Sequence, residues 1–292
     1  MVYDKIQKGL GRVSSSLASL VKVALLSKGV SVRHSQPEGS SIVIMGNGPS
    51  LRSTIDNERE WLESNELMAV NFFANTPDFP KLRPRYYVLA DGVFFNATSH
   101  PNVVALWENL KKVSWEMTLF VPVRSLHLVK ALAMGNDNLR FSTFNLTPVE
   151  GFKGLSHLLY RTGLGMPRPR NVMIPAIMSA IREGFHKIYL CGADHTWTQT
   201  LSVDNENFVV SIQPHFYEDN EKEKERVREA YQGLHLHEVL GSMTVAFRSY
   251  WLLREYADSL GVEIINATPG SMIDAFPRWD PSVFPNLRSA HD

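Results

Sequence analysis

The chain has 292 residues, 44% of them apolar, and its 30 basic residues are balanced by 30 acidic ones. This composition predicts a folded globular protein, and the zero net charge removes any general argument for a nucleic-acid partner. The one cysteine, Cys191, excludes a disulfide framework within the chain and a zinc site built from cysteines.

Residues 4–26 have the pattern of a basic amphipathic helix. Its apolar residues recur at helical spacing, opposite lysine, arginine and serine: Ile6, Leu10, Val13, Leu17, Leu20, Val21 and Ala24. Such a helix can lie on an anionic membrane surface or pack on the protein's own body, and the sequence leaves both open. No stretch approaches about 18 uninterrupted apolar residues. We therefore expect no membrane-spanning helix and, without a signal-peptide pattern, no secretion by that route.

A short apolar run followed by a glycine-rich turn comes next. The run 42–45 is rich in β-branched residues and predicts a buried strand. In a parallel sheet, ligands bind where such a strand ends, because glycine lets backbone approach a ligand and short polar side chains can bond it. A turn without a ligand is the alternative, since the pattern is neither G-x-G-x-x-G nor a P-loop. The turn consists of Gly46, Asn47, Gly48, Pro49 and Ser50.

Three further apolar runs also end in a small polar residue. Asn71 follows the run 67–70, Asp91 follows 85–90, and Asp194 ends the run 187–193, which gives the clearest strand pattern of the chain. The carboxyl ends of parallel strands share one crevice, so we expect these residues to line it together with Asn47. Chance is the alternative, because Asn and Asp are common where strands end.

The second half of the chain supplies the remaining candidates. Arg170, in a loop rich in glycine and proline, can hold phosphate or carboxylate in a bidentate way, and Asn171 precedes a predicted helix at 172–183. Residues 218–231 predict a charged helix that forms a solvated face or part of a lid. A long helix is predicted from 234 to 260, followed by a last strand at 262–266.

The order of these features resembles the bacterial lipooligosaccharide sialyltransferase family. The likeness covers residues 41–275 and is strongest in the Gly-Asn-Gly-Pro-Ser-Leu turn and in the block 184–194, Gly-Phe-His-Lys-Ile-Tyr-Leu-Cys-Gly-Ala-Asp. It implies a single Rossmann-like α/β nucleotide-binding domain with a small lid, which transfers sialic acid from CMP-sialic acid to a glycan with inversion and without a metal. The same turn resembles the 6-hydroxymethylpterin diphosphokinase-like family, which implies diphosphate transfer from ATP with Mg²⁺.

The resemblance also implies roles for individual residues. Asn47, Gly48 and Ser50 would contact the phosphate and ribose of the nucleotide. Asp91 stands where the sialyltransferases have asparagine, and His195 and Trp197 stand where they have two tyrosines that stabilise the departing phosphate. The candidate nucleotide-binding residues are Gly46, Asn47, Gly48, Pro49, Ser50, Asn71, Asp91, Arg170, Asn171 and Gly192; the leaving-group or substrate candidates are His195, Trp197 and His215.

The family's catalytic base is a histidine just before the last long helix, a place that His237 and His235 occupy here. A base with a pKa near neutrality suits the removal of a proton from an acceptor hydroxyl. His215 is a rival for this role. Asp194 completes the set of catalytic candidates.

We therefore predict a helix and linker at 1–36 and a catalytic α/β domain at 37–292, with a lid around 198–235. The predicted protein is a cytoplasmic glycosyltransferase that uses a CMP-linked sialic acid or related keto-sugar, with a surface glycan or lipid-linked glycan as acceptor. Residues 4–26 would contact the inner face of the plasma membrane. We expect no metal cofactor and no nucleic-acid partner.

Two alternatives remain open from the sequence. One is a diphosphotransferase that uses ATP and Mg²⁺, with Asp91 and Asp194 as metal ligands. The other is a nucleotide-sugar-binding protein without catalytic activity. The donor sugar, the acceptor linkage and the oligomeric state stay undetermined.

Overall fold

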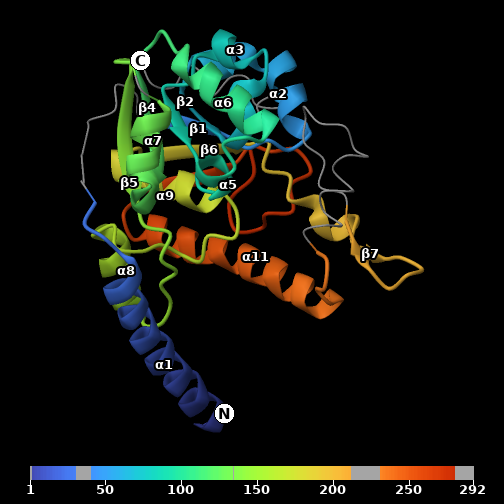
Figure 1. Ribbon diagram of the computed structural model, residues 1–292. Coiled ribbons are helices and arrows are strands. Elements are labelled where there is room, and N and C mark those ends of the chain that lie inside the picture. Colours follow the sequence, from blue (N-terminus) through green and yellow to red (C-terminus); the bar gives the residue numbers. More distant parts are fainter. Residues whose placement is uncertain (1, 31–40, 134, 212–230, 280–292) are drawn as a thin grey trace.

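The predicted apolar runs form the strands of a parallel sheet in the computed structural model, which describes residues 2–30, 41–133, 135–211 and 231–279. The sheet has seven strands among the described residues, in the order β5-β4-β3-β2-β1-β6-β9 (Figure 1). All six of its neighbouring pairs are parallel. The strands are β1 (Ser41–Met45), β2 (Glu66–Val70), β3 (Tyr86–Val88), β4 (Met117–Pro122), β5 (Leu139–Phe144), β6 (Lys187–Cys191) and β9 (Glu263–Asn266).

The chain reverses its direction of travel across the sheet between β1 and β6. From β1 it moves outward through β2, β3 and β4 to β5, then returns to place β6 on the other side of β1. The last residue of β1, Met45, is in register with Cys191, the last residue of β6. The turns that follow these two strands therefore leave the sheet side by side, at the topological switch point where open α/β sheets bind ligands.

Helices cover both faces of the sheet, because alternate residues of the central strands point to opposite sides. Ile42 and Ile44 pack in a core with α9 and α11, whereas Val43 and Met45 pack in a second core with α2, α3 and α6. The predicted α/β class with a mostly parallel sheet is confirmed. The helices are α2 (Ser50–Asn57), α3 (Arg59–Glu63), α4 (Phe79–Leu82), α5 (Val93–Asn96), α6 (Pro101–Lys111), α7 (Leu126–Leu132), α8 (Lys153–Arg161), α9 (Met173–Glu183) and α11 (Leu236–Asp258), with 3₁₀ turns η1 (Asn71–Asn75), η2 (Val123–Ser125) and η3 (Thr196–Gln199).

The predicted lid region is described only at its two ends. Residues 202–203 (β7) and 209–210 (β8) pair as a small antiparallel sheet that is separate from the central one. Residues 218–230 of the predicted charged helix lie outside the described residues. The lid therefore remains a prediction.

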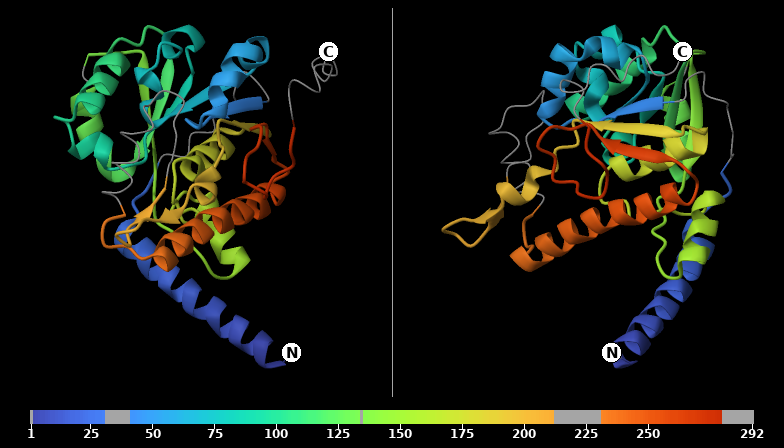
Figure 2. Two further views of the ribbon diagram at one scale, coloured as in Figure 1. Left: turned by 90° about the vertical axis from the view of Figure 1, so that its right-hand side faces the viewer. Right: turned by 180° about the vertical axis from the view of Figure 1, so that it is seen from behind.

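The N-terminal helix α1 (Val2–Leu26) packs on the body with its polar side. Ser16 and Ser19 are buried, and the Ser19 hydroxyl donates to the Glu150 carbonyl at 2.8 Å and accepts from the Glu150 N–H at 2.9 Å. Its apolar side is exposed, and the helix projects away from the sheet (Figure 2). By length and composition alone the window Gly9–Leu26 is apolar enough to cross a membrane, and 11% of it is buried.

The bonds of Ser19 give a prediction for how α1 is attached. Replacing Ser19 with alanine leaves both backbone groups of Glu150 without this buried partner, so we expect a loss of about 1–3 kcal/mol in the free energy of unfolding. Urea denaturation measures the effect. Ser14→Ala is the matched control, because the Ser14 hydroxyl makes an exposed bond within the helix, to the Gly11 carbonyl. Equal stability of the two variants would contradict the assigned role of Ser19.

Candidate functional site

The turns after β1 and β6 are bonded to each other through their backbones. The Gly46 N–H donates to the Cys191 carbonyl at 2.7 Å, and the Gly48 N–H donates to the Gly192 carbonyl at 2.8 Å. This contact needs glycine: a Cβ atom on Gly46 would lie 2.5 Å from the Gly192 oxygen. Gly46, Gly48 and Gly192 therefore hold two turns together, a structural role that the sequence pattern did not distinguish from a role in ligand binding.

Asp194 joins the same two turns through its side chain. Its Oδ2 atom accepts from the Ser50 hydroxyl at 2.8 Å, and its Oδ1 atom accepts from the Ser50 N–H at 3.2 Å. Burial raises the pKa of the Asp194 carboxyl, and the bonds from Ser50 oppose this shift. A carboxylate offers about four lone-pair sites, so Asp194 retains acceptor capacity for another hydroxyl.

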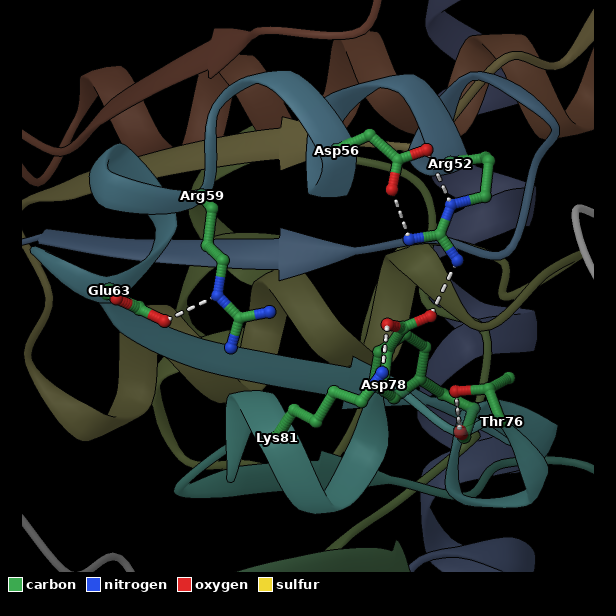
Figure 3. Close-up of polar contacts among 8 residues, drawn as sticks. Arg52, Asp56, Arg59, Glu63, Thr76, Asp78 and Lys81 are labelled. Atoms are coloured by element: carbon green, nitrogen blue, oxygen red, sulfur yellow. Dashed lines mark hydrogen bonds and ion pairs between the residues drawn. The ribbon is translucent and has the colours of Figure 1, made fainter.

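The bonds of Ser50 bear on the predicted phosphate contact, which stays a prediction. The N–H and hydroxyl of Ser50 are the donors that would hold a phosphate at the start of α2, and both are bonded to Asp194. The nearby guanidinium of Arg52 is also engaged: it bonds Asp56 at 2.7 Å and Asp78 at 2.7 Å (Figure 3). Pro49, the remaining predicted residue of the turn, is exposed and precedes α2.

Asn47 and Asn71 are brought together at the ends of β1 and β2, as the sequence predicted. The Asn47 Nδ2 group donates to the Val70 carbonyl at 3.1 Å. Asn71 has a left-handed backbone with φ of 51°, and its Oδ1 atom is buried without a hydrogen-bond partner among the described residues. Asn47 thus stabilises the backbone at the end of β2, and a role of Asn71 toward a ligand stays a prediction.

Asp91 does not join this group. Its side chain is exposed and accepts from the Val93 N–H at 3.0 Å, which caps its own turn. The strands that precede Asp91 and Asp194, β3 and β6, are three positions apart in the sheet. At a spacing of about 4.8 Å per strand, that separation is about 14 Å. This strand separation does not favour one Mg²⁺ ion shared by both carboxylates, and the magnesium alternative stays a prediction.

A buried hydrogen-bonded chain connects two other predicted residues, His195 and Asn171. The Tyr250 hydroxyl donates to the Asn171 Oδ1 atom at 3.0 Å and lies 2.6 Å from the His195 Nε2 atom. Because the Tyr250 hydroxyl donates its hydrogen bond to Asn171, its oxygen accepts a hydrogen bond from the N–H at Nε2 of His195. The other ring nitrogen, Nδ1, then carries no proton and can act as an acceptor. Burial lowers the pKa of His195 to about 3, so the ring is neutral. The centroids of the Trp197 and His195 rings lie 4.2 Å apart.

The segment after β9 forms hydrogen bonds with the backbone of the turn after β6. Ser271 donates through its hydroxyl to the Ala193 carbonyl at 2.7 Å, and the Thr268 hydroxyl accepts from the Ala193 N–H at 3.1 Å. Thr268, Ser271 and Tyr250 were not among the predicted site residues. Tyr250 lies in the middle of a long helix and carries no sequence signal beyond its residue type.

The predicted histidine bases lie elsewhere. His235 caps the start of α11 in a capping box with Glu238, and both His235 and His237 are exposed. His237 is thirteen positions before Tyr250 on the same helix, a distance of about 20 Å along its axis. Arg170 is exposed, and His215 lies outside the described residues. Of the three catalytic candidates, Asp194 alone lies at the switch point.

A hollow with a volume of about 430 Å³ lies at the opposite end of the strands from the switch point. Glu66 and Arg85, which line it, stand at the amino ends of β2 and β3 and form an ion pair at 3.3 Å. The hollow is therefore separate from the switch point. Its position carries no information about the candidate site.

No family model matches the sequence, and no curated protein matches it. Among solved structures, the chain is similar to the MAf glycosyltransferase from Magnetospirillum magneticum AMB-1, with a TM-score of 0.49 and 11% sequence identity. The similarity covers 89% of this chain and 37% of that protein. The resemblance to sialyltransferases and to the pterin diphosphokinase-like family therefore remains a hypothesis that rests on sequence motifs.

The glycine contact predicts a sharp difference between two alanine substitutions. In Gly48→Ala the new Cβ atom would overlap the Asp194 carboxylate, so we expect a loss of about 1–3 kcal/mol in the free energy of unfolding. Gly154→Ala on α8 is the control, because nothing lies within 4 Å of its Cβ position and alanine favours a helix by about 0.5–1 kcal/mol. Chemical denaturation of both variants tests the contact, and a harmless Gly48→Ala would contradict it.

The neutral His195 predicts a pH dependence of stability. The unfolded imidazole takes up a proton near pH 6.5, whereas the folded one does so only near 3. The unfolded state binds more protons between these values, so the contribution of His195 is complete above pH 6.5 and falls as the pH is lowered. Wild type should therefore lose more stability than His195→Gln between pH 6.5 and 4.5. Parallel slopes in urea denaturation would contradict the assignment.

Proposed function

We propose that this protein is a glycosyltransferase that uses a nucleotide-activated sugar. The observation that carries the proposal is the buried Asp194 carboxylate, bonded to Ser50 at the switch point of a parallel sheet. Ligands of such sheets bind at this position. The acceptor group available there, the Asp194 carboxylate, suits the hydroxyl groups of a ribose or a sugar.

Sugar transfer also needs a group that accepts a proton, and we assign this role to Asp194. Burial raises the pKa of its carboxyl, which makes the carboxylate a stronger base than an exposed one. In the proposed step the acceptor oxygen forms a bond to the anomeric carbon and gives its proton to Asp194. The bond from the anomeric carbon to the phosphate oxygen breaks, and the nucleotide leaves with the electron pair. Attack opposite the leaving group inverts the anomeric centre.

The donor that we propose is a CMP-linked sialic acid or related keto-sugar, and the acceptor is a glycan hydroxyl. This choice rests on the sequence resemblance of the turn 46–50 and the block 184–194 to the lipooligosaccharide sialyltransferases. A CMP leaving group carries one phosphate, whose charge neutral hydrogen-bond donors can stabilise. The MAf protein from Magnetospirillum is also named a glycosyltransferase, but the proposal depends on the residues of this chain.

Nucleotide binding and turnover test the proposal in one set of variants. CMP should raise the melting temperature without Mg²⁺, because a ligand bound by the folded state alone stabilises it. In Asp194→Asn, transfer from a CMP-sugar should fall at least about 100-fold, as expected when a general base is lost. Asp91→Asn is the matched control: its carboxyl is exposed after β3, three positions from β6 in the sheet, and activity should be kept. His237→Ala tests the alternative base in parallel.

The other outcomes separate the alternatives. Stabilisation by ATP only with Mg²⁺, together with loss of turnover in Asp91→Asn, would overturn sugar transfer in favour of diphosphate transfer. Binding of CMP-sugar with no turnover in wild type would favour a binding protein. Full activity of Asp194→Asn with an inactive His237→Ala would move the role of base to His237.

A further inference from the structure

The apolar side of α1 is exposed along the described part of the helix. Large aliphatic side chains that are mostly buried in soluble proteins are here between 43% and 71% exposed. They recur at helical spacing and so form one stripe, which we call the leucine face. The leucine face consists of Leu10 (66%), Val13 (43%), Leu17 (59%), Leu20 (44%), Val21 (58%) and Leu25 (71%).

The body of the protein contacts the opposite side of this helix. Ser16, Ser19 and Val23, spaced three and four residues apart, form the docked side. The Ser16 hydroxyl accepts from the Phe152 N–H at 2.9 Å, and Ser27, just after the helix, donates to the Leu164 carbonyl at 2.5 Å. Because these polar bonds fix the rotation of α1, the leucine face points away from the body. Such a continuous apolar stripe marks a binding surface.

The charge of this segment identifies the chemistry of its partner. Residues 5–37 hold six Lys or Arg and no acidic residue, although the whole chain is neutral. A second copy of the chain on the leucine face would bring two such basic segments together, whereas anionic lipid headgroups complement them. We propose that α1 binds the surface of an anionic lipid bilayer through the leucine face, with the body held above it.

The helix binds along the surface and does not cross the bilayer. The window Gly9–Leu26 passes a test of length and composition for a spanning helix, but it contains Arg12 and Lys22. Crossing would also break the bonds of Ser16 and Ser19 to residues 150 and 152. A helix in the interface instead inserts only its apolar side, to a depth of about 5–10 Å. The serine contacts can then persist in the bound state.

Vesicle flotation of the full chain tests this proposal. Wild type should float with vesicles of equal parts phosphatidylglycerol and phosphatidylcholine, and less with phosphatidylcholine alone. In Leu17→Gln/Val21→Gln the affinity for mixed vesicles should fall at least about tenfold, because two exposed aliphatic side chains no longer enter the bilayer. Glutamine is a good helix former, so α1 itself should persist.

The matched control places the same change on other helices. Val104→Gln/Leu240→Gln alters side chains that are 45% and 42% exposed on α6 and α11, and it should float like wild type.

The proposal is overturned if wild type does not float with mixed vesicles, or if Leu17→Gln/Val21→Gln floats equally well. Equal flotation of wild type with both vesicle types would overturn the role of anionic lipid. A wild-type dimer that the α1 variant makes monomeric, without flotation, would assign the leucine face to a second copy. The test does not depend on sugar transfer, so either proposal can fail without the other.

Discussion

The close backbone contact between the turns after β1 and β6 is the constraint on which the candidate site depends. Two N–H groups of the first turn donate to two carbonyls of the second, at 2.7 and 2.8 Å. At this separation a side chain on Gly46 or Gly48 would collide with the facing turn. The contact in turn brings Asp194 onto Ser50, at the start of α2. Glycine here permits a contact within the protein that sets the position of a carboxylate.

This arrangement places a hydrogen-bond acceptor at the switch point and engages the arginine of α2 elsewhere. Asp194 supplies a buried carboxylate, and Arg52, the arginine of α2, is bonded to two other carboxylates. The neighbouring His195 is kept neutral by burial and is held in one tautomer by Tyr250 and Asn171. Such surroundings favour recognition of hydroxyl groups over direct binding of a phosphate at the turn. The distinction matters because the motif alone suggests the phosphate.

The N-terminal helix has its polar side inward, the reverse of an ordinary surface helix of a soluble protein. Its serines are buried because their hydroxyls satisfy backbone groups at 150 and 152, which would otherwise lose hydrogen bonds on burial. The apolar side is thereby left for another surface. The serine side of α1 thus docks on the body of the protein, and the leucine face lies exposed on the opposite side of the helix axis.

The sequence by itself determined the strands and helices that are strongly periodic. The run 42–45 is apolar and rich in β-branched residues, the run 188–191 is mostly apolar, and Gly184 ends α9 with a left-handed backbone, so local chemistry fixes these elements. It did not reveal β5, whose exposed and half-buried positions give no clear apolar run. Tertiary structure alone decided that Ser50 meets Asp194, that Tyr250 links His195 to Asn171, and that Asp91 stands apart. These contacts join residues that are distant in the chain, and they depend on strand order and on the rotation of helices, which no local pattern encodes.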